Sequence, residues 1–178
     1  HDWLKFIKNN SKTVKVASGD LNFNYLLKNI VNLKLNILLS TGASDFNEIK
    51  SAIKIIKKKY KNKIKDKLVL MHCVSSYPVP DNLANMLSVK YLKDKFNLTI
   101  GYSNHVIGIN ACIASICLGA RIIEFHFTDN KKRKFRDHQL SLNKADVKKL
   151  ILTGNNLNLL LGEYKKELSK SVKKDKEN

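Results

Sequence analysis

The chain lacks three features that would place it in a membrane or outside the cell. No apolar stretch approaches the ~18 residues that a membrane-spanning helix needs, so we expect no membrane partner. Residue 1 is His rather than Met, and residues 1–10 have the pattern of a helix, so we expect no signal peptide and interpret the chain as a piece of a longer one. The three cysteines, Cys73, Cys112 and Cys117, form no CxxC pair, and their odd number in apolar surroundings indicates reduced thiols and a cytoplasmic protein.

Acidic residues are also scarce, with 15 Asp and Glu against 33 Lys and Arg, which gives a net charge of +18. A charge of this size is compatible with a basic nucleic-acid-binding module. The lysines, however, recur on the polar sides of predicted helices and form no stripe interleaved with aromatic residues, so we expect solvated helix faces and no nucleic-acid partner. Hydrophobic residues make up 43% of the chain, enough for the core of one domain over residues 1–164. Residues 165–178 are expected to form a frayed basic tail.

Short β-prone segments alternate with amphipathic helical segments along the chain. The predicted strands are 14–18, 35–40, 67–74, 98–103 and 121–127. The predicted helices are 21–33, 44–60, about 82–96, 108–120, and a last one from a cap at Asn143 to Gly162. Ser44 is the expected cap of the second of these helices. This regular alternation predicts a parallel sheet covered by helices.

Side-chain alternation within the strands distinguishes between an open doubly wound sheet and a barrel. In 121–127, Ile123, Phe125 and Phe127 face one way, whereas Ile122, Glu124 and His126 face the other. A face that is apolar below and polar near the carboxyl end is typical of a barrel interior. Only five strands are present where a closed barrel needs eight. The sequence therefore predicts a partial TIM (β/α)8 barrel of the α/β class, made of about strands four to eight.

Two histidines follow neighbouring predicted strands. His105 and His126 end adjacent strands, which in a parallel sheet lie roughly 4.8 Å apart. Two imidazoles projecting from one face can share a divalent ion, and they can equally be unrelated polar residues at strand ends. Glu124 points to the same side as His126, where it either acts on a ligand or proton or serves as the partner of an inner cation such as Lys15.

The other strand ends carry hydroxyl groups and one amine. This mixture suits a phosphate or carboxylate group, although each serine alone is compatible with ordinary loop chemistry. The residues of this set are Lys15, Ser18, Ser40, Ser75 and Ser103. Tyr77, before Pro78, either lines a substrate site or packs in its turn. Cys73 is interpreted as a small apolar residue, and His72 as a core histidine with a satisfied ring.

Six segments in this order resemble the sialic acid synthases, the N-acetylneuraminate synthase (NeuB) family. They are VKVASGD (14–20), ILLSTGAS (37–44), LMHCVSSYPVP (70–80), IGYSNHVIGI (100–109), GARIIEFHFT (119–128) and RDHQLSL (136–142). The resemblance runs from about Thr13 to Gly162. It implies condensation of phosphoenolpyruvate with an N-acylated amino sugar such as N-acetylmannosamine, release of phosphate, and a divalent metal, typically Mn²⁺ with Mg²⁺ or Co²⁺ as alternatives.

The resemblance also implies roles for single residues. His105 and His126 match the metal ligands, Tyr77 and Asp137 match sugar-contacting positions, and Glu124 matches a carboxylate of the catalytic site. The positions that match the phosphoenolpyruvate-binding set are Lys15, Ser18, Ser40, Ser75 and Ser103; Ser75 stands where some members have Asn.

The chain departs from the family pattern at several positions. Asn104 stands in place of Asp in SDH, which is expected to remove a charge beside the metal. Phe125 stands in place of Lys in EKH, and KFRDH (134–138) in place of GPDH. The amino-terminal strands and the carboxyl-terminal antifreeze-like domain of the family are not in this sequence, so we expect the fragment to be inactive alone and the full-length protein to be a homodimer. A different barrel aldolase, with Lys15 as a Schiff base, is the alternative enzyme.

Overall fold

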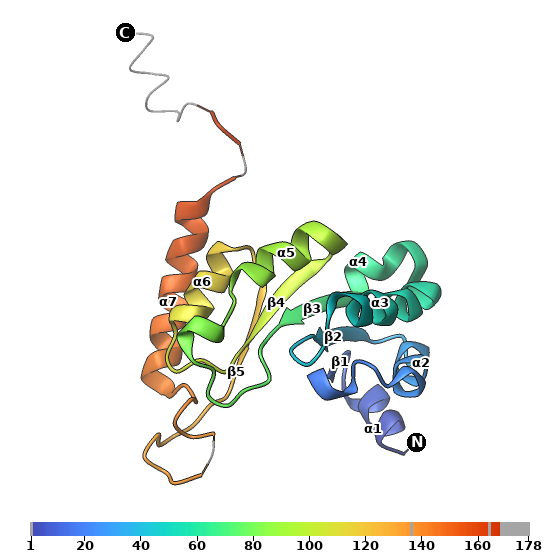
Figure 1. Cartoon of the computed structure of the whole chain (residues 1–178), viewed down its shortest axis with the longest axis horizontal. Coiled ribbons are helices and arrows are strands. Elements are labelled where there is room, and N and C mark those ends of the chain that lie inside the picture. Colours follow the sequence, from blue (N-terminus) through green and yellow to red (C-terminus); the bar gives the residue numbers. More distant parts are fainter. Residues whose placement is uncertain (1, 136, 164, 168–178) are drawn as a thin grey trace.

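Five parallel strands form one sheet in the computed structural model, which describes residues 2–135, 137–163 and 165–167. The sheet has the order β1-β2-β3-β4-β5, so each strand pairs with its neighbour in the sequence (Figure 1). The strands are β1 Thr13–Val16, β2 Asn36–Ser40, β3 Leu68–His72, β4 Thr99–Asn104 and β5 Ile122–Phe125. The parallel sheet predicted from the alternation is confirmed.

Helices connect the strands and cover one face of the sheet (Figure 1). They are α1 Asp2–Asn10, α2 Asn24–Asn32, α3 Phe46–Tyr60, α4 Ile64–Lys67, α5 Leu87–Phe96, α6 Asn110–Cys117 and α7 Lys144–Leu161. Short 3₁₀ turns occupy Ser18–Asp20, Lys61–Lys63 and Asp81–Leu83. None of the helices among the described residues has the length and apolar character needed to cross a membrane.

The two faces of the sheet differ in burial. Val14 and Val16 of β1 are buried under the helices, whereas Lys15 between them is exposed on the inner face. The same outward face in the next three strands supplies the core residues Ile37, Leu39, Leu68, Leu70, Ile100 and Tyr102. Helices cover one face only. The other face carries apolar residues such as Met71 and, at the carboxyl ends of the strands, polar residues such as Ser103 and Glu124, and this arrangement is a half-barrel.

Several boundaries predicted from the sequence were wrong by a few residues. Ser44 does not cap α3; Asp45 does, because its carboxylate accepts the Glu48 N–H at 2.9 Å while Glu48 accepts the Asp45 N–H at 2.8 Å. The strand predicted to end at residue 74 ends at His72. The helices predicted from 21 and about 82 begin at Asn24 and Leu87. A 3₁₀ turn at Asp81–Leu83 covers the predicted start of the second helix, and one at Ser18–Asp20 precedes the first. Most of the predicted tail, residues 168–178, lies outside the described residues.

His72 is a buried core histidine, as its position inside a strand predicted. Its Nε2 lies 3.0 Å from the Ala84 carbonyl, to which it donates, and its ring stacks on Tyr102 at a centroid distance of 5.9 Å. Burial, which disfavours the charged ring, lowers the pKa of His72, and the bond to Ala84 only partly opposes this.

We expect His72 to make the folded protein less stable in mild acid. Because its pKa is lowered on folding, the unfolded chain takes up a proton near pH 6.5 before the folded chain does. The stability is therefore present above about pH 6.5 and falls as the pH drops toward the folded pKa. Urea unfolding of the full-length gene product across this range should show less pH dependence in His72→Gln than in the wild type. An equal change of unfolding free energy with pH in both proteins would contradict this, since every other titrating group is common to both.

Candidate functional site

The inner face of the sheet collects its polar residues at the carboxyl ends of the strands. Lys15 of β1 and Glu124 of β5 belong to the two outermost strands, yet Lys15 Nζ lies 3.0 Å from Glu124 Oε2. The contact is an ion pair but not a hydrogen bond, since Glu124 Oε2 has no hydrogen-bond partner among the described residues. The sheet is thus curved enough for its two edge strands to meet through their side chains. Both of the alternatives predicted for Glu124, a partner for Lys15 and a place in a site, are compatible with this geometry.

His105 is fixed from two sides. Its Nδ1 donates to the Val74 carbonyl at 2.8 Å, and its own carbonyl accepts the Val79 N–H at 2.9 Å. Since a carbonyl only accepts, Nδ1 carries the hydrogen and Nε2 keeps its lone pair in the neutral ring. Burial is the main cause that lowers the pKa of His105, with neighbouring His126 and Lys15 acting in the same direction. The lowered pKa favours the neutral form, which is the form that can bind a metal ion.

His126 lies beside His105, at a ring-centroid distance of 5.5 Å. Asp137 approaches His126 from the segment after β5, with Oδ2 3.7 Å from Nδ1. Tyr77 lies against both imidazoles, at centroid distances of 4.2 Å from His105 and 6.0 Å from His126. We call Lys15, Tyr77, His105, Glu124, His126 and Asp137 the carboxyl-end cluster. Burial, followed by nearby Cys73, Asp137 and Glu124, raises the pKa of Tyr77, so its hydroxyl remains a hydrogen-bond donor.

Ser18 follows β1, which ends at Val16, and its side chain contacts residues that follow β2 and β3. Its Oγ accepts the Gly42 N–H at 3.2 Å and lies 3.2 Å from Cys73 Sγ. A methyl group on Gly42 would come within 2.7 Å of Cys73 Sγ and 3.0 Å of Ser75 Oγ, so only glycine fits this approach. Cys73 is buried, as predicted, but it also contacts a predicted ligand-binding serine, which the sequence analysis missed.

The remaining predicted serines occupy different environments. Ser40 is buried on the inner face, and its Oγ has no hydrogen-bond partner among the described residues. Ser103 is buried on the inner face of β4, in register with Glu124 of β5. Ser75 is exposed beside Gly42. A buried hydroxyl without a partner carries a desolvation cost that a bound anion can relieve.

Asn104 lies on the opposite face of β4 from His105 and is 1% exposed. Its Oδ1 accepts from the Tyr102 hydroxyl and the Val106 N–H, and its Nδ2 donates to the carbonyls of Val106 at 2.9 Å and Gly108 at 3.3 Å. The amide thus shapes the turn after His105. An ionised aspartate could not donate these two hydrogen bonds. The Asn104 amide in place of Asp in SDH therefore stabilises the backbone of the turn, and its side chain lies on the face opposite His105.

The two histidines suit a divalent cation as ligands. The free Nε2 of His105 and the nearby ring of His126 are nitrogen donors of the kind that transition metals accept. Among the described residues no group of three or more histidine, cysteine or acidic side chains is arranged to hold a metal ion. Two imidazoles alone leave the coordination shell of a divalent ion incomplete, so His105 and His126 would form only part of a metal site.

A helix-covered parallel half-barrel, with charged and imidazole side chains at its carboxyl ends, defines the class of TIM-barrel-type proteins. The chain belongs to the NeuB family, whose model matches residues 2–166. The family resemblance inferred from the six segments is confirmed.

Individual relatives agree with this assignment. An N,N'-diacetyllegionaminic acid synthase of Campylobacter jejuni is 35% identical over 164 residues, which are 92% of this chain and 48% of that protein. The protein MJ1065 of Methanocaldococcus jannaschii is 40% identical over 161 residues, 88% of this chain and 46% of its own length. The crystal structure of an N-acetylneuraminic acid (sialic acid) synthetase from Leptospira borgpetersenii, in complex with citrate, has a TM-score of 0.90 and 32% identity over 98% of this chain and 60% of that one. The chain thus spans about half the length of these curated relatives.

Proposed function

We propose that the protein is a nonulosonic acid synthase, which condenses phosphoenolpyruvate with an N-acylated amino sugar such as N-acetylmannosamine and releases phosphate. The observation that carries the proposal is the carboxyl-end cluster, in which two imidazoles 5.5 Å apart lie beside the Lys15–Glu124 ion pair. Membership of the NeuB family and similarity to synthases of legionaminic and sialic acids support the reaction class. The full-length gene product is proposed to act as a cytoplasmic homodimer.

In this proposal the chain binds phosphoenolpyruvate through its cation and hydroxyl groups. Lys15 supplies a positive charge for the phosphate or carboxylate of the substrate. The serines donate hydrogen bonds, and the hydroxyl of Ser40, which has no partner among the described residues, gains an acceptor when the anion is bound. The serines of this set are Ser18, Ser40, Ser75 and Ser103.

The sugar is proposed to lie on the imidazole side of the cluster, against Tyr77 and Asp137. C3 of phosphoenolpyruvate forms a bond to the aldehyde carbon of the open-chain sugar, water adds to C2, and phosphate leaves with cleavage of its C–O bond. We assign to Glu124 the role of accepting the proton of the incoming water. A divalent ion held by His105 and His126, proposed to be Mn²⁺, would supply Lewis-acid polarisation of the aldehyde oxygen.

The proposal is tested by phosphate release from phosphoenolpyruvate, with N-acetylmannosamine and related amino sugars, in the full-length gene product. We expect Lys15→Met to raise the KM for phosphoenolpyruvate by about 10- to 100-fold, the range of a lost charge-assisted hydrogen bond. The KM for the sugar should change much less. Lys12→Met, an exposed lysine three residues earlier, is the matched control and should leave both values unchanged.

An unchanged KM for phosphoenolpyruvate in Lys15→Met would refute the anion-binding role. The rival aldolase predicts a different result, namely a Lys15 adduct with substrate that borohydride traps. Trapping distinguishes the two roles, because only a Schiff base joins Lys15 covalently to a substrate. Salt-sensitive DNA or RNA binding in place of phosphate release would favour the nucleic-acid-binding alternative.

A further inference from the structure

The segment between β5 and α7 brings Asp137 to the carboxyl-end cluster. Apart from an isolated bridge between Phe127 and Leu142, its described residues form no strand, and no helix begins before Lys144. Asp137 nevertheless lies 3.7 Å from His126, and its charge contributes to the raised pKa of Tyr77. Some other contact must therefore fix the position of Asp137.

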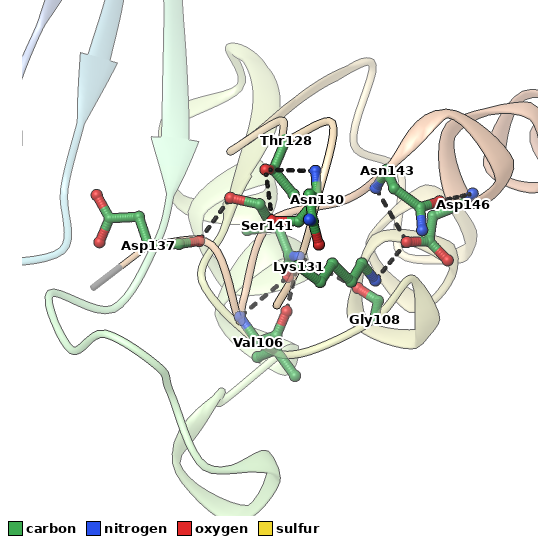
Figure 2. Close-up of polar contacts among 10 residues, drawn as sticks. Val106, Gly108, Thr128, Asn130, Lys131, Asp137, Ser141, Asn143 and Asp146 are labelled. Atoms are coloured by element: carbon green, nitrogen blue, oxygen red, sulfur yellow. Dashed lines mark hydrogen bonds and ion pairs between the residues drawn. The ribbon is translucent and has the colours of Figure 1, made fainter. Parts of the chain in front are cut away.

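Ser141 makes that contact. Its Oγ donates to the Asp137 carbonyl at 2.5 Å, and its backbone N–H donates to the same oxygen at 3.1 Å. Ser141 is 3% exposed, so these bonds are shielded from competing water. Figure 2 shows the result: the main chain of Asp137 is joined to Ser141, while its carboxylate points away from the other labelled residues of the segment.

Ser141 is in turn held beside His126. The next residue, Leu142, donates its N–H to the His126 carbonyl at 2.8 Å and accepts the Thr128 N–H at 3.0 Å. Leu142 is fully buried, which anchors this bridge in the core. One short stretch, 141–142, therefore bonds to the backbone of both His126 and Asp137 and sets the distance between them.

Thr128, near the start of the segment, makes a second set of contacts within it. Its Oγ1 lies 2.7 Å from His138 Nδ1. The same oxygen accepts the Asn130 N–H at 3.1 Å (Figure 2). Thr128 is 3% exposed. Thr128 and Ser141, one on each side of Asp137 in the sequence, thus form a frame around it.

We propose that Ser141 is a positioning residue for sugar binding: it holds the Asp137 carboxylate at the imidazole side of the cluster. The expected change in the KM for the sugar rests on the proposed function. The expected loosening of the segment between β5 and α7 rests on the structure alone. Ser141 is assigned an indirect role, because its hydroxyl bonds to the backbone carbonyl of Asp137.

The kinetic test compares Ser141→Ala with Ser115→Ala in the full-length gene product. Ser115 is the matched control, because it is also buried and its Oγ donates to a backbone carbonyl, that of Cys112 at 2.7 Å, on α6 away from the cluster. Both variants should lose some thermal stability. Only Ser141→Ala should raise the KM for the sugar, by about tenfold, with little change in the KM for phosphoenolpyruvate. Ser141→Thr, which keeps the hydroxyl, should recover part of the loss.

A double-mutant cycle separates positioning from general damage. If Ser141 acts through Asp137, Ser141→Ala adds no further increase of the sugar KM in an Asp137→Ala background. Additive increases, or equal increases in Ser141→Ala and Ser115→Ala, would overturn the inference.

Hydrogen–deuterium exchange provides a readout that does not depend on activity. Peptides covering 128–142 should exchange faster in Ser141→Ala than in the wild type and at the wild-type rate in Ser115→Ala. Unchanged exchange in Ser141→Ala would refute the positioning role whatever the enzyme does. Absence of phosphate release by the wild type, with the expected exchange pattern, would refute the proposed function and leave the frame around Asp137 supported.

Discussion

Replacing either His105 or His126 with Ala should reduce the affinity of the protein for Mn²⁺ by at least about 100-fold and abolish metal-dependent condensation. The reason is geometric: the two rings lie 5.5 Å apart, and His105 Nδ1 is bonded to the Val74 carbonyl, so Nε2 is oriented for a ligand. Loss of outer-shell partners alone typically costs 10- to 100-fold in metal affinity, and loss of a direct ligand should cost more. Titration calorimetry or the electron paramagnetic resonance of free Mn²⁺ measures the affinity without any substrate.

His72→Gln is the control for this experiment. It removes a buried histidine that lies on the other face of the sheet and donates to the Ala84 carbonyl, so Mn²⁺ binding should not change. Wild-type Mn²⁺ affinity in His105→Ala and His126→Ala would sink the assignment of these residues as ligands. Removing the metal with a chelator should have the same effect on turnover as either substitution.

The 178-residue chain expressed by itself should self-associate and should not synthesise a nonulosonic acid. Within the described residues, β1 and β5 each pair on one side only, and unpaired strand edges recruit other chains. Beside β1 lies an apolar hollow of about 520 Å³, lined by Val14 and by exposed aromatic side chains that include Trp3, Phe23 and Tyr25. Edges and apolar surface at one place favour association over a stable monomer.

Ser11 offers a variant that should increase this association. Its Oγ accepts the Thr13 N–H at 3.1 Å and donates to the Thr13 carbonyl at 2.6 Å, which occupies two backbone groups of β1. Ser11→Ala should therefore raise the associated fraction, measured by light scattering after gel filtration or by sedimentation velocity. Ser76→Ala is the control, because it removes an exposed hydroxyl contact to the Pro78 carbonyl, away from both edges. It should leave the associated fraction unchanged. A stable, fully active monomer of residues 1–178 would show that the incomplete barrel is the wrong description.

The local sequence determined much of the fold. Alternation of apolar and polar residues within strands of four to six residues fixed which side of β1 carries Lys15 and which side carries Val14 and Val16. The same period placed Glu124 and His126 on one face. The constant spacing of parallel strands then sufficed to predict that His105 and His126 lie side by side, because both follow neighbouring strands. The caps were less predictable, since Ser44 and Asp45 are adjacent and both can accept a backbone N–H.

Only the tertiary structure decided the contacts that depend on curvature and on side-chain reach. Lys15 and Glu124 are on the two outermost strands, and nothing in the sequence states that the sheet bends until they meet at 3.0 Å. Ser18 reaches Gly42 and Cys73 from a turn beyond its strand, at sequence separations of 24 and 55 residues. Asn104 resembled a change of charge in the sequence, but the alternation of β4 turns its amide to the other face. Ser141 had no signal in the sequence, because a serine that bonds a backbone carbonyl has the same local pattern as any other serine, and only the fold brings that carbonyl beside the histidines.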